Sequence, residues 1–465
     1  MKYSVIAFPV YILINILSLF RIDAQVFEKG KITDSLLCAN HPGYSYSLYL
    51  PTNYDSRKRW PAILIFDPAA RAKVAVEVFT KAAEQYGYVV ACSYNSRNGP
   101  ANNNFTAADY MFADLKQRFS LDEKRIFASG FSGGSRFAFS LASSGRIFAG
   151  VIGCGAGLPN ERIYYPSSGS TFIYYGIVGT RDMNYLEMFD LDGFLKKTGV
   201  VGYLKTFDGG HQWPTPDIIC EAVEWVEIQS INKKLRPTAS AFIEDYKSKM
   251  NSQFIKLESN KNLFEAARYM AYLIRDFPGD PVASETLKSL QKLEQSAEYK
   301  NELRDWNKTA NQERKLDESF VTALENVIYR ESIPDTTKAW WKAEIESLIK
   351  MKQKDKPVNS QMASRLLNFV SILCSEQGLA FFRQRKWEVS GFLFEVCTWS
   401  DSENMNNYYN LARSLSGSNK KREAIEALNK AAGHGFTSRK TIELEPAFNN
   451  IRNDEKFKSL LIKLK

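Results

Sequence analysis

Three residues that lie far apart in the chain have the types needed for nucleophilic catalysis: a serine, a histidine and an aspartate. Ser132 lies in Gly130-Phe-Ser-Gly-Gly134, which has the form G-x-S-x-G. A serine hydroxyl is a weak nucleophile until a neighbouring base removes its proton, and that base needs a carboxylate to fix its tautomer. A catalytic role for Ser132 therefore requires that the chain also supply such a base and such a carboxylate.

The residues around Ser132 predict how it is presented. The apolar run Ile126-Phe-Ala128 precedes it, and apolar residues at helical spacing follow it over 137–142. A G-x-S-x-G segment between a strand and a helix is typical of a nucleophile elbow. We expect glycines at 130 and 134 because side chains there would collide with neighbouring backbone, and Ser132 above the positive N-terminus of the helix. The alternative is a glycine- and serine-rich turn without chemistry.

The choice of base is narrow because the chain has only three histidines. His41 stands beside Pro42-Gly43 and is interpreted as a surface turn residue, and His434 lies in the distant second half. His211 lies in the glycine loop Phe207-Asp-Gly-Gly-His-Gln-Trp-Pro214, between a predicted strand and a predicted helix. This position favours His211 as the base, with a structural loop histidine as the alternative.

The carboxylate that orients His211 is predicted to be Asp182, which lies in the loop after the preceding strand. Asp190 and Asp192 compete for the role, but they fall inside or beyond the next helix. Asp208 is three residues from the histidine and has the sequence context of a turn former. The proposed set therefore runs serine, aspartate, histidine along the chain.

A tetrahedral intermediate needs hydrogen-bond donors aimed at its negatively charged oxygen. The backbone N–H of Gly133, directly after Ser132, is the first predicted donor. The second should come from the loop Asp67-Pro-Ala-Ala-Arg71. Proline has no N–H, so Ala69 is predicted to supply it. Arg71 is expected to pair with Asp67. The alternative is that Arg71 contacts an anionic group of the substrate.

These residues must be positioned by alternating strands and helices. Strands are predicted over 44–50, 60–66, 88–92, 126–128, 149–153, 171–177 and 202–207, and helices over 72–86, 105–119, 137–142, 185–196 and 216–231. Such alternation implies an α/β protein with a mostly parallel, doubly wound sheet covered on both faces. Ligands bind such sheets at the carboxyl ends of the strands, where Ser132 is predicted to lie.

Residues 44–231 resemble α/β-hydrolases of the esterase D, dienelactone hydrolase and polyhydroxybutyrate depolymerase group. The resemblance rests on Gly130-Phe-Ser-Gly-Gly134, Gly179-Thr-Arg-Asp182 and Gly209-Gly-His-Gln-Trp-Pro214, and on the order of serine, aspartate and histidine. It implies an α/β-hydrolase sheet and hydrolysis of carboxylic esters through an acyl-enzyme, without metal or organic cofactor.

The chain departs from this group in two places. Relatives usually carry His-Gly where this chain has Asp67-Pro68, so the oxyanion loop is expected to have a different shape. The span from Ser132 to Asp182 is short and leaves little room for an inserted lid. An open, shallow site is therefore expected.

The second half changes character near Arg236-Pro237. Strand-like runs stop there, and amphipathic helical patterns dominate residues 237–465. A shift of 34 residues aligns small and large apolar positions, pairing Cys374 with Tyr408, Gly378 with Ala412, Phe381 with Leu415, Ser390 with Ala424, Phe394 with Leu428 and Cys397 with Ala431. Residues 374–436 thereby resemble tetratricopeptide repeats, and an earlier half-unit fits the second helix of the same pattern more weakly, with Ala266, Met270, Leu273 and Pro278.

Stacked helical pairs form concave surfaces that usually bind peptides or partner proteins. A protein partner at the helical half is one expectation, and the alternative is an appendage that only packs against the hydrolase domain. Trp340 and Trp341 lie in a helical run and are expected to be packing residues rather than a ligand platform.

Length and charge limit the class of protein. The chain has 465 residues, enough for two or three domains with their own cores. Its formal net charge is +9, but the basic residues are scattered in short groups among acids, such as Lys196-Lys197 and Lys420-Lys-Arg422. This favours solvated surface charge over a nucleic-acid-binding track.

The N-terminus has the pattern of an export signal over residues 1–24. Lys2 precedes an apolar stretch over 4–20, and small or apolar residues lead to Ala24, with Gln25 as the new N-terminus. An uncleaved membrane anchor is the alternative. We expect an exported protein, periplasmic or secreted, with no membrane span after signal removal.

The cysteines do not indicate a metal site. They are widely spaced without a C-x-x-C pair, and histidines are few. Free cysteines that act as small core residues are favoured over a disulfide framework. The six are Cys38, Cys92, Cys154, Cys220, Cys374 and Cys397.

The sequence thus predicts an exported serine esterase, with Ser132, Asp182 and His211 as catalytic residues and Gly133 and Ala69 as oxyanion donors. Its substrate would be a small-molecule or polymer-linked ester. A peptidase of the prolyl-oligopeptidase type is the second hypothesis. The third is an inactive hydrolase-fold scaffold that binds proteins through its helical repeats.

Overall fold

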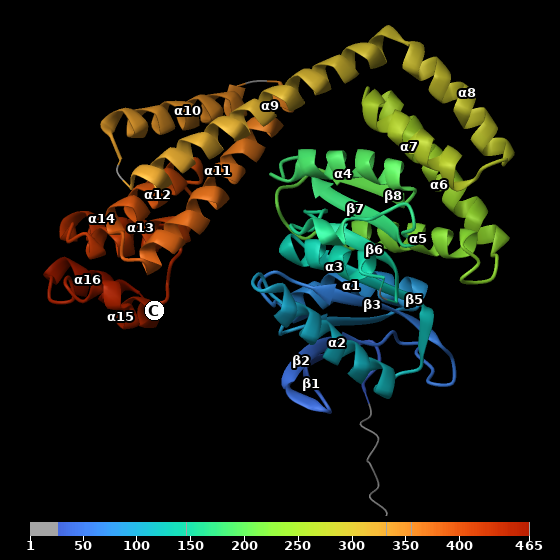
Figure 1. The fold of residues 1–465 in the computed structure, drawn as a ribbon, viewed down its shortest axis with the longest axis horizontal. Helices are drawn as coiled ribbons and strands as arrows, with labels where there is room; N and C mark the ends of the chain where they lie inside the picture. The colour runs from blue at the N-terminus through green and yellow to red at the C-terminus, as the bar shows by residue number, and fades with distance from the viewer. Residues whose placement is uncertain (1–26, 146, 332, 355, 465) are drawn as a thin grey trace, which may run out of the picture.

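The protein is built on one twisted sheet that is followed by a long series of helices (Figure 1). The computed structural model describes residues 27–145, 147–331, 333–354 and 356–464. The predicted export signal over residues 1–24 lies outside the described residues.

The sheet has eight strands in the order β1-β2-β4-β3-β5-β6-β7-β8. Pairs β1–β2 and β2–β4 are antiparallel, and the other neighbours are parallel. The strands are β1 Ile32–Cys38, β2 His41–Tyr49, β3 Trp60–Phe66, β4 Val89–Ser93, β5 Leu121–Phe131, β6 Phe148–Cys154, β7 Ile173–Gly179 and β8 Val201–Phe207. The predicted mostly parallel sheet is confirmed, and the chain has an α/β-hydrolase fold followed by an all-helical region.

Helices cover both faces of the sheet because its central strands are apolar on both sides. On β3, Ile63 and Ile65 face the core beneath α1 and α5, whereas Leu64 and Phe66 face the core beneath α2, α3 and α4. These helices are α1 Ala72–Tyr86, α2 Ala101–Arg118, α3 Gly133–Ser143, α4 Tyr185–Thr198 and α5 Pro216–Asn232. A short 3-10 helix, η1 Arg162–Tyr164, lies between β6 and β7.

Two features of the first strands differ from the prediction. Strand β1 was not predicted, because its apolar and polar residues do not alternate and its pairing is irregular, with breaks in register and Ser35 at a φ of +53°. His41 was predicted to be a surface turn residue. It begins β2 instead and stacks on the Tyr110 ring, with centroids 3.5 Å apart.

The helical region begins close to the predicted boundary, but the first core continues past it. Tyr246, Met270 and Leu293 belong to the same buried cluster as β8 and α5. Helices α6 to α8 therefore pack on the hydrolase half. They are α6 Ser240–Ser259, α7 Leu263–Asp276 and α8 Pro281–Gln295.

Besides the core around the sheet, the helical region has a second core and, around Leu428, Phe448 and Phe457, a third core. The long helix α9, Ala297–Arg330, runs from the end of α8 to the second core, which starts at Phe320 (Figure 1). The remaining elements are α10 Asp335–Lys354, α11 Pro357–Arg383, α12 Trp387–Ser400, α13 Met405–Gly417, α14 Lys421–Gly433, α15 Arg439–Leu444, η2 Pro446–Phe448 and α16 Glu455–Lys463. Trp341 is fully buried in this second core, which confirms its packing role.

The small residues of the predicted repeat lie where helices approach closely. A side chain at Gly378 on α11 would press on the Phe394 ring of α12, and the Ser390 hydroxyl donates to the Gly378 carbonyl at 2.9 Å. The tetratricopeptide assignment itself stays a prediction.

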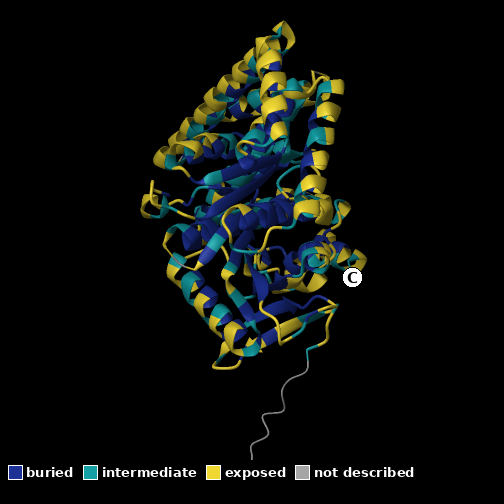
Figure 2. Ribbon diagram, turned by 90° about the vertical axis from the view of Figure 1, so that its right-hand side faces the viewer, coloured by how far each residue is buried: buried dark blue, intermediate teal, exposed yellow. Residues whose placement is uncertain are grey.

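Buried residues concentrate along the sheet and the inner helix faces (Figure 2). All six cysteines are free and buried, as expected for small core residues. Among the described residues, no helix combines the length and apolar character needed to cross a bilayer.

Candidate active site

The loops at the carboxyl edge of the sheet bring Ser132, His211 and Asp182 together. The Ser132 Oγ lies 2.9 Å from His211 Nε2, and His211 Nδ1 lies 3.0 Å from both carboxylate oxygens of Asp182. Ser132 follows β5, Asp182 follows β7 and His211 follows β8. Neighbouring parallel strands end at one edge, so residues far apart in sequence meet there.

The backbone at Ser132 has the sharp turn of a nucleophile elbow. Ser132 has a φ of +52° and a ψ of −122°, a conformation that non-glycine residues rarely adopt. A Cβ at Gly130 would overlap the Gly134 carbonyl group, and a Cβ at Gly134 would overlap the Phe66 carbonyl. The two glycines are needed for the reason predicted from the sequence.

The acid loop and the histidine loop are tied together through their backbones. Thr180 N–H donates to the Phe207 carbonyl at 2.8 Å, and Arg181 N–H donates to the Gly209 carbonyl at 2.9 Å. These bonds fix the spacing between Asp182 and His211. Asp182 is 1% exposed, and one of its oxygens also accepts the Asn184 N–H at 2.9 Å.

The other acids and histidines that the sequence offered lie elsewhere. Asp190 pairs with Arg314 at 2.8 Å and Asp192 with Lys196 at 2.9 Å. Asp208 pairs with Arg181. The His434 ring stacks on Tyr408 in the helical half, 5.1 Å between centroids. Asp182 is thus the carboxylate that contacts His211.

The structure corrects the predicted role of Ala69. Its N–H donates to the Asp67 side chain at 2.9 Å, so it is already occupied and does not point at Ser132 as a free donor. Gly133 is different. As the first residue of α3 its N–H has no acceptor within the helix, and none is found elsewhere in the described part of the chain.

Asp67 organises the loop that should have supplied the second donor. It is fully buried and accepts from the Arg71 guanidinium at 2.8 Å and from the Trp213 indole at 3.0 Å. Burial alone would raise the pKa of Asp67, but these hydrogen bonds hold it below its ordinary value. The predicted pairing of Arg71 with Asp67 is confirmed, and Asp67 is therefore a charged anchor between this loop and the loop of His211.

Asn98, which the sequence analysis missed, lies beside the nucleophile. A side chain at Gly133 would overlap the Asn98 carboxamide, so that carboxamide lies directly against the start of α3. The Asn98 N–H donates to the Pro68 carbonyl at 2.9 Å, which holds it next to the oxyanion loop. No motif marked it, because it lies in an irregular loop after β4.

A cavity of about 470 Å³ opens above Ser132 and has walls from both halves of the protein. The hydrolase half contributes Asn98, Phe105, Gly133, Phe137, Tyr164 and Met183, among others, and α11 contributes Phe369, Ile372, Leu373 and Glu376. The sequence predicted an open, shallow site because it offered no lid insertion. A wall comes instead from a helix that lies more than two hundred residues along the chain from Ser132.

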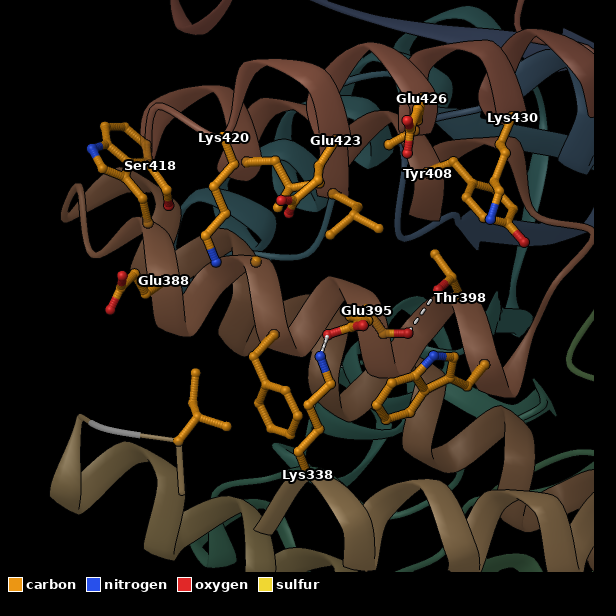
Figure 3. A pocket seen from close by; sticks show the side chains of 18 of the residues that line it. Lys338, Glu388, Glu395, Thr398, Tyr408, Ser418, Lys420, Glu423, Glu426 and Lys430 are labelled. Carbon is orange, nitrogen blue, oxygen red and sulfur yellow. Dashed lines mark hydrogen bonds and ion pairs between the residues drawn. The ribbon is translucent and has the colours of Figure 1, made fainter. Parts of the chain in front are cut away.

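A second cavity, of about 600 Å³, lies between α10, α12, α13 and α14 (Figure 3). Five glutamates and three lysines line this helical groove, together with Trp387, Phe392, Trp399 and Tyr408. One of the charged pairs, Lys338 with Glu395 at 2.7 Å, bridges α10 and α12. None of Ser132, Asp182 and His211 lines the groove, and within the described ranges no cluster of side chains has the make-up of a metal site.

Comparison with known proteins finds no matching family model and no similar curated protein. Several solved structures are similar. The substrate-bound fluorophosphonate-binding serine hydrolase F of Staphylococcus aureus is 13% identical, with 39% of this chain and 91% of that chain covered and a TM-score of 0.32. Esterase 2 of Thermogutta terrifontis, phosphorylated by paraoxon, is 14% identical, with 45% of this chain and 96% of that chain covered and a TM-score of 0.35. An inhibited esterase B from Lactobacillus rhamnosis is 13% identical over 44% and 90%, with a TM-score of 0.36.

Proposed function

We propose that the protein is a serine hydrolase that cleaves carboxylic esters. The observation that carries the proposal is the chain of contacts from Ser132 Oγ to His211 Nε2, at 2.9 Å, and from His211 Nδ1 to Asp182, at 3.0 Å. In this arrangement a base can accept the serine proton while a buried carboxylate holds the imidazole in the required tautomer.

The reaction has two halves. The Ser132 Oγ attacks the ester carbonyl and its proton passes to His211 Nε2, so that a tetrahedral oxyanion forms. The oxyanion collapses, and the departing alcohol takes the proton from His211, leaving an acyl group on Ser132. A water molecule then attacks the acyl group, again giving its proton to His211, and the carboxylic acid leaves as Ser132 regains its proton.

The oxyanion would be held by two donors, the Gly133 N–H and the Asn98 side-chain amide. The Gly133 N–H is free at the start of α3, and the Asn98 carboxamide lies against Gly133 with its Oδ1 nearest, so the amide must turn over to present Nδ2 as the second donor. Removal of one oxyanion donor typically costs about 10²- to 10³-fold in kcat. The substitution Asn98→Ala should lower kcat in this range, whereas Asn102→Ala, at an exposed position outside the cavity lining, should leave it within about twofold.

Turnover of p-nitrophenyl acetate by the purified protein tests the proposed function. The substitution Ser132→Ala should lower kcat by about 10⁴-fold or more and leave the circular dichroism spectrum and unfolding midpoint nearly unchanged. Equal turnover by the two proteins would overturn the proposal. Parallel assays with aminoacyl amides separate the esterase from a peptidase of the prolyl-oligopeptidase type.

We propose as a second function that the helical groove binds an extended peptide of a protein partner. Its mixed charges and four aromatic side chains support a ligand with both polar and apolar groups. A peptide array probed with the intact protein tests this. The Tyr408→Ala variant should no longer bind the peptides that the parent protein binds. The Tyr329→Ala variant should still bind them, because Tyr329 lies outside the groove and is 90% exposed. Retention of the same peptides by both variants would contradict the proposal.

We propose further that the protein is exported, on the sequence pattern of residues 1–24. Expression of the full chain in a bacterial host should yield protein outside the cytoplasm that begins at Gln25. Material that keeps Met1 and sediments with the membrane would favour the uncleaved anchor instead.

A further inference from the structure

One face of α11 points at the hydrolase half and carries both polar and apolar residues. The residues of this face recur every three or four positions: Arg365, then Asn368 and Phe369, then Ile372 and Leu373, and then Glu376. Leu366, Val370 and Cys374, on the other face, are buried in the second core. The helix is therefore held between two structures, its own helical core and the loops of the active site.

The polar end of this face binds the loop that carries Asp182. Arg365 is 5% exposed and donates to the Thr180 carbonyl at 2.7 Å, while its guanidinium lies 4.5 Å from the Tyr185 ring centre. The Asn368 amide donates to the Arg181 carbonyl at 3.1 Å. These are the two carbonyls directly before Asp182 in the chain, so α11 positions the acid loop.

A buried ion pair fixes Arg365 itself. Its Nε and Nη2 donate to the two carboxylate oxygens of Glu313 on α9, at 2.7 and 2.6 Å. A bidentate pair of this kind leaves the guanidinium little freedom. The position of α11 against the active site is therefore determined by α9 as well as by the acid loop.

The apolar end of the face meets aromatic residues in the active-site cavity. Phe369, Ile372 and Leu373 line the cavity from α11. From α2 and α3 it is lined by Phe105 and Phe137, whose ring centres are 5.1 Å apart. A cavity of about 470 Å³ with such walls has room for an aromatic or branched substrate group next to Ser132.

The charges of the cavity favour substrates that are not anionic. Among the described residues that line it, the single cation is Arg136, and Glu187 already binds that guanidinium through two hydrogen bonds of 2.7 and 2.6 Å. Glu161 and Glu376 also line it, and neither has an ion-pair partner in the described part of the chain. A substrate carboxylate would therefore meet unbalanced negative charge.

We propose that α11 is part of the active site: it forms the specificity wall of the ester-binding cavity, which selects uncharged or cationic esters that carry an aromatic or branched apolar group. This inference rests on the proposed esterase function. It assigns to the helical half a direct role in substrate choice that is independent of any protein bound in the helical groove.

Two pairs of esters test the apolar wall. Ethyl acetate is compared with ethyl 3-phenylpropanoate, in which the acyl group carries the ring, and with 2-phenylethyl acetate, in which the alcohol carries it. The intact protein should prefer at least one ring-bearing ester. Leu373→Ala and the milder Phe369→Leu should lower kcat/KM for that ester by about 10-fold and leave ethyl acetate within about twofold. Val358→Ala, on the exposed start of α11, should change neither.

The substitution Glu376→Lys tests the charge of the wall. Glu376 is exposed, so the variant should fold like the parent protein. The ratio of kcat/KM for ethyl hydrogen succinate to that for ethyl butanoate should rise several-fold. Glu388→Lys, an exposed substitution in the helical groove, should leave the ratio unchanged.

Different results would overturn the proposed esterase function and the proposed role of α11. An intact protein that hydrolyses no ester would overturn the proposed function and the inference with it. An active protein whose α11 variants keep the ester preferences of the parent would overturn the inference alone.

Discussion

At the scale of single residues, the position of the Ser132 hydroxyl is determined by how closely three backbone segments approach one another. Gly134 faces the Phe66 carbonyl without space for a side chain. The Gly134→Ala substitution must therefore push β3 away from α3. Overpacking of this kind costs roughly 1–3 kcal/mol, so the urea midpoint should fall, and esterase turnover should fall with it.

Gly193→Ala is the matched control for that substitution. Gly193 lies inside α4, and a Cβ there would meet no atom within 4 Å. Alanine in an open helical position stabilises by roughly 0.5–1 kcal/mol relative to glycine. A Gly134→Ala variant as stable as Gly193→Ala would contradict the account of the elbow.

The residues of the site differ in how far sequence could predict them. Ser132, Asp182 and His211 each stand in a local pattern at the end of a strand, and a parallel sheet brings strand ends together. Ala69 was predicted from the loop sequence alone, which does not reveal that the Asp67 side chain turns back onto its N–H. Asn98 has no pattern of its own and is recognised only from its contact with Gly133.

At the scale of elements, the contact between α9 and α11 contains a carboxyl group that titrates near neutral pH. Burial, and then the nearby carboxylate of Glu313, raise the pKa of Asp317 to about 7. An unfolded aspartate has a pKa of about 3.9, so the folded protein binds the extra proton between these values. Folding stability should therefore fall as the pH rises from about 4 to about 7.

The substitution Asp317→Asn removes this titration, and the direction of its effect on stability can be measured. The variant should be more stable than the parent at pH 8, by on the order of 1 kcal/mol or more, and the difference should shrink as the pH approaches 4. Urea unfolding at the two pH values measures it. A variant less stable than the parent at pH 8 would show that Asp317 acts as a stabilising anion instead.

Elements were predictable where one physical signal dominated. The run Trp60–Phe66 is apolar throughout and forms β3, and the helical spacing over Ala72–Tyr86 forms α1. Strand β1 was missed because its apolar residues do not alternate with polar ones, so the sequence shows no strand period there. The active-site face of α11 was missed because Phe369 and Leu373 look no different in sequence from Leu366 and Val370, which face the helical core.

At the scale of the whole molecule, the two halves share a core as well as a cavity. Tyr203 on β8 packs on Tyr272 of α7, with ring centres 4.2 Å apart, and the Trp225 indole donates to Asp276 at 2.8 Å. Removal of everything after the predicted boundary at 236 would expose these apolar surfaces.

A truncated protein of residues 25–236 should accordingly bind a hydrophobic dye and elute as aggregates in size-exclusion chromatography, whereas the chain of residues 25–465 should do neither. The comparison is made at equal concentration and pH. A truncated protein that is monomeric and unfolds at the same urea concentration as the full chain would show that the hydrolase half is complete without α6 to α8.

The central claim is that Ser132 is a nucleophile activated by His211, and covalent labelling tests it most directly. Intact protein is treated with a fluorophosphonate probe, digested and mapped by mass spectrometry. We predict one adduct on the peptide that contains Ser132, its loss in Ser132→Ala and much slower formation in His211→Ala. An absence of labelling, or equal labelling of the Ser132→Ala protein, would contradict the account.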